Sequence, residues 1–407
     1  MATKGEKDSR FSPPWNKKSM KGKPLICIMA DYPAWLLPDM DYLPSRTGHA
    51  TWLHMLRPYF ASITHEFEIH WVVMTKGITK PMNLEVDRQF FHLLPRNKKI
   101  TAMLTAYYFE SRQMLKLIKQ IKPTVVHAWG TEDAYAMTAT RISMLPVLFS
   151  LQGCITECLR VTRCGFLMRL LGFYEKYALC HLKRATGESE RACKNMLSIN
   201  PRLQTSVVEY GVNEAFHKIT RSLSYEPSIV FIGGLFAAKG IRELVGVMKS
   251  PTMSHIRLEI WGSGPEFGTL KASATGNVAF YGHATREQVM QALSRAWALV
   301  IPTHCDTGPT VVKEALAAGV PVITTTVAGA SEQIADKLSG HVIPPYDTTA
   351  LEQAILSICK SRETSIKMGT HDLDETRKRL SGETTVDAFA EIYRDMISIE
   401  DNFKVLN

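Results

Sequence analysis

The sequence predicts an α/β protein with two doubly wound parallel sheets, one in each half of the chain. Two observations support this prediction. From residue 24 onward, short apolar runs of strand length alternate with amphipathic stretches, as they do in βα units around parallel sheets. In addition, 407 residues exceed what a single hydrophobic core usually serves, so two domains are expected.

The expected strands fall into two series. They cover residues 24–30, 67–74, 124–129 and 146–152 in the first half, and 228–234, 257–262, 278–282, 298–302 and 321–325 in the second. Between strands, residues 103–121 and 287–298 place apolar side chains three and four positions apart, which is typical of a helix packed on one face. Each series therefore forms one sheet with packing helices.

The segment 209–227 lies between the two series and sets the domain organisation. We expect a basic leader at 1–23, which should be a solvated, disordered tail, followed by Rossmann-like domains at 24–217 and 218–383. Residues 384–407 predict an amphipathic helix and a tail that pack back toward the N-terminal domain. Ligands of such sheets bind at the carboxyl ends of the strands, so the chemistry is expected between the domains.

Composition and charge exclude several classes of protein. With 45% apolar and 21% charged residues, the chain is neither disordered nor a disulfide scaffold. The net charge is +9, and residues 1–23 contribute much of it, with seven Lys and Arg against two acidic residues. This distribution gives the leader a weak affinity for anionic surfaces, and no nucleic-acid partner is expected.

Targeting signals and cysteine patterns are not evident. The leader lacks an apolar core, and no run approaches the ~18 apolar residues of a membrane helix, so a cytoplasmic location is expected. The eight cysteines form no CxxC pair, which favours reduced thiols over a zinc site or disulfides. Asp39 and Asp41 form a DxD in a polar loop, and we interpret it as a loop and expect no metal.

The segment 301–325 reads as a strand, a loop, a short helix and a second strand. Gly308 and Pro309 precede the helix, and the fixed φ of proline suits its start. The amides of Thr310, Val311 and Val312 are then left at the positive end of the helix. This arrangement predicts a site for a phosphate.

Asp306 and Glu314 flank these amides. They lie eight positions apart, so both carboxylates can face one cleft. A carboxylate pair suits the hydroxyl groups of a ribose and of a sugar, because it accepts charge-assisted hydrogen bonds. The alternative is that Asp306 caps a turn and Glu314 is a surface residue of the helix.

This segment resembles the E-x7-E signature of the retaining GT-B glycosyltransferases of family 4, the glycosyl transferases group 1. Four further landmarks fall in the family's order. They are YGVNEAF at 210–216, IGGLFAAKG at 232–240, LEIWGSGPE at 258–266 and TTTVAGASEQI at 324–334. The resemblance implies a GT-B fold, in which two Rossmann-like domains face a central cleft.

The family's roles transfer residue by residue. The resemblance implies donor binding by the C-terminal domain and acceptor binding by the N-terminal one, with Glu314 on the nucleotide ribose, Asp306 on the transferred sugar and Lys239 on the donor diphosphate. Lys239 precedes a helix whose dipole it opposes, and an anion between them relieves the conflict. Close approach to the donor is expected at Gly48, Gly234, Gly264, Gly308, Thr310, Val311 and Glu332.

The acceptor side is predicted from fewer residues. His49, His127 and Glu132 are the candidates, because they lie in or after strand-end segments that resemble the family. A structural His127 and an exposed loop His49 are the alternatives. At Gln152, many relatives carry a histidine, and glutamine can bind a sugar hydroxyl but cannot take a proton.

A second departure concerns Gly234, where many relatives carry an arginine. Its absence removes one of two cations expected on the diphosphate, and Arg46 or Arg242 is the candidate substitute.

Residues 159–185 combine apolar and basic side chains. The apolar positions are Leu167, Leu170, Leu171, Tyr174, Tyr177 and Ala178, with arginines and lysines around them. We favour an ordinary packing helix with extended cations. The alternative is a helix on an anionic membrane surface, at the inner face of the cell membrane, which presents the enzyme to lipid-linked acceptors.

The sequence thus predicts a hexosyltransferase-type enzyme, retaining and metal-independent, that uses a nucleotide sugar as co-substrate and no other cofactor. Its acceptor is a saccharide or lipid-linked hydroxyl in polysaccharide or glycolipid biosynthesis. The alternatives are a GT-B nucleotide-sugar epimerase and a catalytically weak nucleotide-sugar-binding partner protein.

Overall fold

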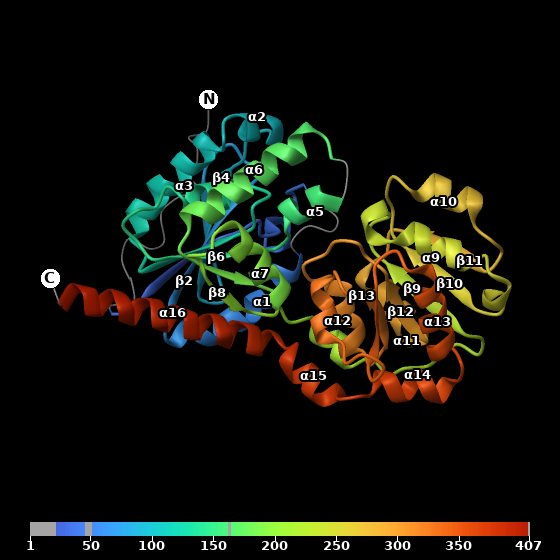
Figure 1. The fold of residues 1–407 in the computed structure, drawn as a ribbon. Coiled ribbons are helices and arrows are strands. Elements are labelled where there is room, and N and C mark those ends of the chain that lie inside the picture. Colours follow the sequence, from blue (N-terminus) through green and yellow to red (C-terminus); the bar gives the residue numbers. More distant parts are fainter. Residues whose placement is uncertain (1–21, 45–50, 162–163, 406–407) are drawn as a thin grey trace, which may run out of the picture.

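A computed structural model of the 407-residue chain describes residues 22–44, 51–161 and 164–405 (Figure 1). It contains two parallel-sheet α/β domains side by side, joined by two chain crossings. The two sheets expected from the sequence are therefore present.

The N-terminal sheet has eight strands in the order β3-β4-β2-β1-β5-β6-β7-β8. All neighbours are parallel except β3 and β4. The strands are β1 Leu25–Met29, β2 Glu68–Thr75, β3 Met82–Val86, β4 Gln89–Pro95, β5 Val125–Trp129, β6 Val147–Ser150, β7 Arg184–Gly187 and β8 Gln204–Val207.

The C-terminal sheet has six parallel strands in the order β11-β10-β9-β12-β13-β14. They are β9 Ser228–Ile232, β10 Arg257–Trp261, β11 Val278–Gly282, β12 Ala298–Ile301, β13 Val322–Thr325 and β14 Gly340–Ile343. Both β1 and β9 have the next strand of the chain on one side and a later strand on the other, so each sheet reverses its winding beside them. Such a reversal is where doubly wound sheets bind their ligands.

Helices cover both faces of the sheets. In the N-terminal domain they are α1 Thr51–Ser62, α2 Lys99–Leu104, α3 Tyr108–Ile121, α4 Ala134–Ala139, α5 Ile155–Val161, α6 Phe166–His181 and α7 Glu190–Ile199. In the C-terminal half they are α8 Glu214–His217, α9 Ile241–Val247, α10 Phe267–Ser273, α11 Arg286–Arg295, α12 Thr310–Ala317, α13 Thr348–Ile358, α14 Arg362–Gly369, α15 Leu373–Arg379 and α16 Gly382–Val405.

Strand β1 shows how the N-terminal core is divided. Its side chains alternate, so Ile26 and Ile28 face one layer of helices while Cys27 and Met29 face the other. All four side chains are fully buried. The sheet is thus covered on both faces, as a parallel sheet requires.

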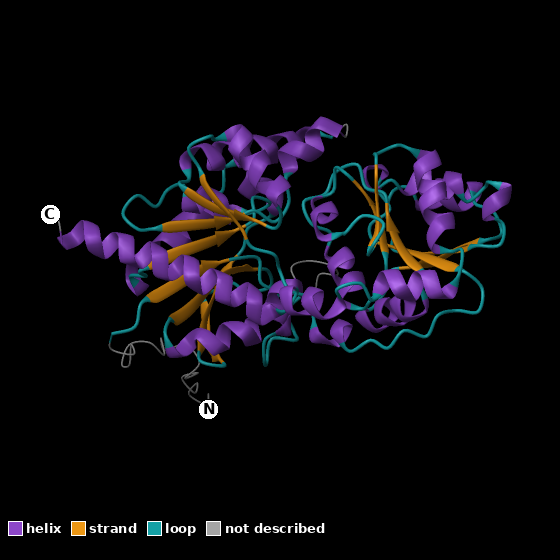
Figure 2. Cartoon of the chain, turned by 60° about the horizontal axis from the view of Figure 1, so that its bottom comes forward, coloured by secondary structure: helices purple, strands orange, loops and turns teal. Residues whose placement is uncertain are grey.

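The last helix, α16, returns to the N-terminal domain (Figures 1 and 2). Phe389 and Tyr393 belong to the N-terminal core, and Arg394 forms an ion pair with Glu66 at 2.8 Å. At the crossing, the amide of Val212 donates to the carbonyl of Leu380 at 3.0 Å. The two chain segments that cross between the domains are therefore hydrogen-bonded to each other.

The two hydrophobic cores show where the chain passes from one domain to the other. Tyr210 packs in the N-terminal core and Val212 in the C-terminal core. On the return, Leu380 belongs to the C-terminal core and Val386 to the N-terminal one. The change of core thus comes slightly earlier than the expected boundary at 217/218 and brackets the one at 383/384.

Two expected helices are wrong in extent. Residues 103–121 contain a break, because Ala106 and Tyr107 adopt left-handed conformations with φ of 47° and 55° that end α2 before α3 begins. Residues 159–185 comprise the end of α5, the separate helix α6 and the start of β7. Strands β3, β4, β7, β8 and β14 were not among the expected strands.

Candidate functional site

A cavity of about 620 Å³ lies between the two domains. Its volume is typical of a site for a small organic ligand. The C-terminal wall includes Lys239, Thr310, Val311 and Glu314, and Trp52 from α1 belongs to the opposite wall. Together with Gly234, which also lines it, five residues that the sequence places on a nucleotide-sugar donor thus meet in one cavity.

Helix α12 supplies the anion-binding part of this cavity. It begins at Thr310 after Pro309, so the first amides have no partner within the helix. The amide of Val312 nevertheless donates to the carbonyl of Pro309 at 3.0 Å, which leaves the amides of Thr310 and Val311 at the helix end. The expected phosphate site therefore rests on two amides rather than three.

Glu314 lies one turn further along α12 and is half-buried at the cavity. Burial raises the pKa of its carboxyl to about 7, although the charges of Arg286 and Lys313 act to lower it. A carboxyl with this pKa exchanges its proton near neutral pH, so its ability to accept hydrogen bonds depends on pH.

Lys239 and Asp306 form an ion pair beside the cavity. Burial acts to lower the pKa of Lys239, but the charge of Asp306 and the hydrogen bond between the two groups outweigh it and raise the pKa. The Lys239 side chain is 32% exposed, so its ammonium group is open to a ligand on one side. Asp306 also accepts a hydrogen bond from the amide of Gly308 at 3.2 Å.

Arg286 provides a cation that the sequence analysis missed. It is the first residue of α11, and it lines the cavity together with Gly234. The candidate substitute Arg242 is instead exposed and paired with Glu266 at 2.5 Å. Arg46 lies outside the described residues. The capping box of Thr285 and Gln288 fixes the start of α11 and could have drawn attention to Arg286.

The ring of Phe236 occupies the space next to Gly234. A Cβ atom there would lie 2.7 Å from the ring of Phe236, which is too close for an undisturbed contact. An arginine at this position would therefore require Phe236 to move.

The opposite wall of the cavity is aromatic. The ring of Trp52 stacks on Tyr210 with centroids 4.5 Å apart and on Trp129 at 4.9 Å. Stacked rings of this kind form a rigid apolar surface. Trp52 follows Gly48 and His49 by only a few positions, but no sequence pattern singled it out.

The loop that carries Asp306 is attached to the N-terminal domain. The hydroxyl of Thr307 donates to the carbonyl of Gln152 at 3.0 Å, and the hydroxyl of Ser189 donates to the carbonyl of Thr307 at 3.1 Å. The sulfur atoms of Cys158 and Cys305 lie 2.9 Å apart across the same boundary. These contacts fix the position of Asp306 relative to the N-terminal sheet.

A second lysine, in α12, forms a buried ion pair across the domain boundary. Lys313 donates to Glu188, which follows β7, at 2.5 Å, and both side chains are almost completely buried. The lysine also lies 5.4 Å from the ring centroid of Tyr210. Burial raises the pKa of Glu188 even though Lys313 opposes this.

Comparisons with known proteins agree with this geometry. Residues 212–372 match the family described as glycosyl transferases group 1. The N-acetyl-alpha-D-glucosaminyl L-malate synthase of Bacillus anthracis is 25% identical over 203 residues, which are 48% of this chain and 50% of that protein. The chain thus spans about half the length of this relative.

Two further proteins match most of the chain. A Bacillus subtilis protein named as a glycosyltransferase of teichuronic acid biosynthesis is 26% identical over 344 residues, 78% of this chain and 79% of its own length. The structure of sucrose-phosphate synthase from Thermosynechococcus elongatus superposes with a TM-score of 0.75 at 16% identity, covering 93% of this chain and 100% of that one.

The match to this family lies within the C-terminal half of the chain. The two domains together have the GT-B fold, as the sequence predicts. Activity, donor and acceptor do not follow from the fold.

Several residues expected on the donor lie elsewhere in the C-terminal domain. The carboxylate of Glu332 accepts from the amides of Glu190 and Arg191 at 2.7 and 2.8 Å, so it caps α7 of the N-terminal domain. Gly264 packs against the backbone of Leu235, where a Cβ would lie 2.5 Å from the carbonyl oxygen. Gly308 lies beside Glu188. None of these three contacts is with the cavity.

Gln152 and Glu132 converge above Gly130 at the carboxyl ends of β5 and β6. A Cβ at Gly130 would lie 2.8 Å from Oε2 of Glu132 and 3.0 Å from Oε1 of Gln152. Burial raises the pKa of Glu132 to about 7. Among the residues that the structure describes, no acceptor meets the buried Nε2 of Gln152. The pair thus has hydrogen-bonding capacity to offer to a ligand.

The acceptor-side prediction for His127 conflicts with its surroundings. The ring is fully buried, with Nδ1 2.6 Å from the hydroxyl of Tyr393 and Nε2 2.7 Å from that of Ser150. Burial lowers its pKa well below the usual value. Both nitrogens are engaged, so His127 joins β5 to α16 and does not face an acceptor. His49 and Gly48 lie outside the described residues.

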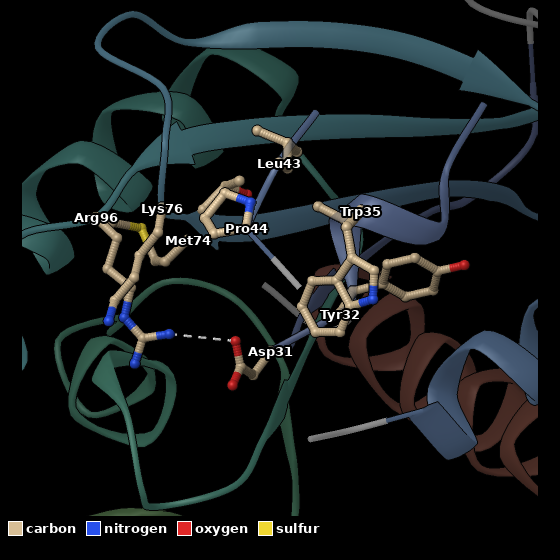
Figure 3. Close-up of a pocket in the computed structure, with 10 residues that line it drawn as sticks. Asp31, Tyr32, Trp35, Leu43, Pro44, Met74, Lys76 and Arg96 are labelled. Carbon is tan, nitrogen blue, oxygen red and sulfur yellow. Dashed lines mark hydrogen bonds and ion pairs between the residues drawn. The ribbon is translucent and has the colours of Figure 1, made fainter. Parts of the chain in front are cut away.

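A smaller hollow of about 20 Å³ lies at the carboxyl ends of β1, β2 and β4 (Figure 3). Arg96 points across it to Asp31, with 3.3 Å between the bonded atoms, and also pairs with Asp133. Trp35 borders the opposite side. The hollow holds little more than a water molecule, and the sequence analysis identified none of these residues.

Proposed function

We propose that this chain transfers a sugar from a nucleoside diphosphate sugar to a hydroxyl group of a saccharide or lipid-linked acceptor, in polysaccharide or glycolipid biosynthesis. The observation that carries the proposal is the cavity between the domains, where Lys239, Glu314 and the start of α12 lie together. The cation and the helix amides match a diphosphate, and the carboxylate matches a ribose of the same ligand.

The leaving diphosphate is the group that most needs stabilisation. In the reaction the bond from the anomeric carbon to the diphosphate oxygen breaks, and the acceptor oxygen forms the new bond to that carbon. Lys239, Arg286 and the amides of Thr310 and Val311 lie where they stabilise the charge that develops on the diphosphate. The acceptor's proton passes to the departing phosphate, and no protein nucleophile is required.

The ion pair of Lys239 and Asp306 allows this role. An ammonium group has three donors, so Lys239 can bind a phosphate oxygen while it keeps Asp306. Asp306 is then positioned to accept from a hydroxyl of the transferred sugar. Retention of configuration and independence of metal ions belong to the proposal, since both rest on the resemblance to family 4.

Gln152 and Glu132 are proposed to meet the transferred sugar or the acceptor from the N-terminal side. The backbone carbonyl of Gln152 accepts a hydrogen bond from Thr307, in the loop that carries Asp306. The backbone of Gln152 is therefore next to the loop whose carboxylate is proposed to bind the sugar. His127 has no part in this proposal. The cytoplasmic location remains a prediction.

A panel of labelled nucleotide sugars tests the proposal. The chain is incubated with each donor, with and without saccharide and lipid-linked acceptors, and the products are separated. Release of the nucleoside diphosphate with transfer or slow hydrolysis is expected for one donor. Nuclear magnetic resonance of the product then gives the anomeric configuration, and addition of a chelator tests metal dependence.

The same assay separates the alternatives. An altered sugar that stays on the nucleotide identifies an epimerase, and donor binding without turnover identifies a binding protein. Asp306→Asn should abolish transfer because it removes the charge opposite Lys239. Asp374→Asn, on the exposed side of α15, is the matched control and should leave transfer unchanged. Equal activity of the two variants would place the site elsewhere.

A further inference from the structure

Large apolar side chains are exposed on one side of the N-terminal domain. On α2 and the start of α3 these are Ile100 at 58%, Leu104 at 61%, Tyr108 at 52% and Phe109 at 53% exposure. Helix α6 adds Phe166 at 70%, Leu167 at 40%, Met168 at 37%, Phe173 at 61% and Tyr177 at 40%. We call these nine side chains the α2–α6 surface. Single exposed apolar residues need no explanation, but a group of nine does.

The two halves of this surface lie against each other. The hydroxyl of Tyr174 in α6 donates to the carbonyl of Met103 in α2 at 2.7 Å. The rings of Tyr107 and Tyr174 meet edge to face, with centroids 5.9 Å apart. Figure 1 shows α2, α3 and α6 next to one another on the outer side of the N-terminal domain.

Helix α6 has its core face and its exposed face on opposite sides. Leu171, Tyr174 and Ala178 are buried, as the packing helix favoured from the sequence requires. Phe166, Arg169, Phe173, Lys176 and Tyr177 are exposed at spacings of three, four, three and one. Aromatic and cationic side chains thus alternate along the outer stripe. The helix thus packs one apolar face on the core, and its exposed face carries both aromatic and cationic side chains.

The charge of this surface has one sign. In residues 96–122 and 164–187 the acidic residues are Glu110 and Glu175, and both are buried. Glu175 points inward, because it accepts from the amides of Ile155 and Thr156 at the start of α5. The exposed charged side chains of these segments are cations: Lys98, Lys99, Arg112, Lys116, Lys119, Lys122, Arg169, Lys176 and Lys183.

We propose that the α2–α6 surface docks the protein on a bilayer that contains anionic lipids. Aromatic side chains favour the interface between water and hydrocarbon, and lysine and arginine reach the phosphate groups from the same helix. A protein partner of the same area would meet nine apolar side chains among cations, with no exposed carboxylate from residues 96–122 or 164–187. The anionic lipid headgroup complements the charge, and the acyl region accepts the aromatic rings.

The docking surface adjoins the cavity. Helix α5 precedes α6, and its Cys158 contacts Cys305, the neighbour of Asp306. A lipid-linked acceptor in the bilayer would thus approach the side of the cavity where Asp306 lies. This last step rests on the proposed function, whereas binding to the bilayer does not. None of the helices that the structure describes is long and apolar enough to cross a membrane.

Sedimentation with vesicles tests the docking. The full chain is mixed with vesicles of phosphatidylglycerol and phosphatidylcholine in equal parts, or of phosphatidylcholine alone. Binding to the first and little binding to the second is expected. Phe166→Ser with Phe173→Ser should weaken binding roughly tenfold. Arg169→Gln with Lys176→Gln should weaken it on the order of twentyfold, and salt should weaken it further.

Matched controls separate this surface from the basic leader, which every variant retains. Tyr225→Ser removes an aromatic side chain that is 91% exposed in the other domain, and Lys249→Gln with Lys360→Gln removes two exposed cations there. These variants should bind as the native chain does. Sedimentation that no α2–α6 variant changes would assign binding to other parts of the chain and overturn the proposal.

A second measurement distinguishes insertion from a protein interface. Tryptophan introduced as Phe173→Trp should be quenched by brominated phosphatidylcholine mixed with phosphatidylglycerol, and Tyr225→Trp should not. If the native chain is a dimer in solution and Phe166→Ser with Phe173→Ser makes it a monomer, the surface joins two copies and the proposal is wrong. Donor hydrolysis without an acceptor should be the same in all these variants, so failure of docking and failure of the proposed activity remain distinct.

Discussion

Two lysine–carboxylate pairs flank the start of α12, and they differ in burial. The Lys239 side chain is 32% exposed and its partner Asp306 12%, whereas Lys313 is 2% and its partner Glu188 8% exposed. Lys239 pairs within the C-terminal domain at the edge of the cavity. Lys313 pairs across the domain boundary and has the ring of Tyr210 beside it.

The difference shows that the same kind of ion pair can have a structural or a ligand-binding role, depending on how deeply it is buried. A buried pair holds two elements together, and loss of one partner leaves an uncompensated charge. A pair open on one side can exchange part of its hydrogen bonding with a ligand at small cost. We therefore expect variants of Lys313 to change stability and variants of Lys239 to change activity.

Lys313→Met tests the buried pair and should have the largest effect. It leaves the Glu188 carboxylate buried without its partner, so the free energy of unfolding should fall by about 3–5 kcal/mol. Urea unfolding followed by circular dichroism measures this change. The double variant Lys313→Met with Glu188→Gln should recover much of the loss. A loss in the single variant that the double variant does not reduce would contradict the pairing.

Lys239→Ala tests the pair at the cavity. Removal of one donor to a developing anion costs about 10²–10³ in turnover, and a loss of this size is expected here. The free energy of unfolding should change by less than about 1 kcal/mol, because the pair is partly exposed. Steady-state kinetics and urea unfolding measure the two quantities. An equal loss of stability in Lys239→Ala and Lys313→Met would remove the distinction between the pairs.

Glu314→Ala tests the carboxylate on the same helix as Lys313. If Glu314 binds the nucleotide ribose, donor affinity should fall by about 1.5–3 kcal/mol, the range for hydrogen bonds to charged groups. Isothermal titration with the donor or with the nucleoside diphosphate measures the affinity. Glu375→Ala, which removes an exposed carboxylate from α15, is the control and should leave affinity unchanged.

The strands that position these pairs could be predicted where apolar residues predominate. β1, β2, β9 and β12 are central and buried, and continuous apolar runs identify such strands. The edge strand β8 is largely exposed, with the polar sequence QTSV, so no apolar run reports it. The turn between β3 and β4 uses Asp87 and Arg88 with positive φ, where the sequence shows no glycine.

The site was predictable in the C-terminal half because its residues lie close together in the sequence. Thr310, Val311 and Glu314 belong to one helix, so their spacing in the sequence determines how they lie relative to one another. Lys313 and Glu188 are 125 positions apart, and no local pattern reports such a pair. Trp52 and Arg286 reach the cavity from elements far from α12 in the sequence, so no spacing relates them to Glu314.

The pH dependence of donor binding is the smallest effect expected. It distinguishes the contribution of Glu314 from those of the two lysine–carboxylate pairs. Because burial raises its pKa to about 7, the carboxylate that accepts from the ribose forms only as pH rises through that value. Donor affinity should therefore increase by less than about tenfold across neutral pH, and Glu314→Gln should remove the increase.

Stability should change in the opposite direction. The folded-state pKa of Glu314 lies above the ordinary glutamate value of 4.5, so its contribution to the free energy of unfolding is complete below that value and is lost as pH rises through about 7. Glu132 has a similar pKa and contributes in the same sense, so the variants Glu314→Gln and Glu132→Gln must be compared. A donor affinity that still rises with pH in Glu314→Gln but is constant in Glu132→Gln would move the ribose-binding role away from α12 to the N-terminal wall.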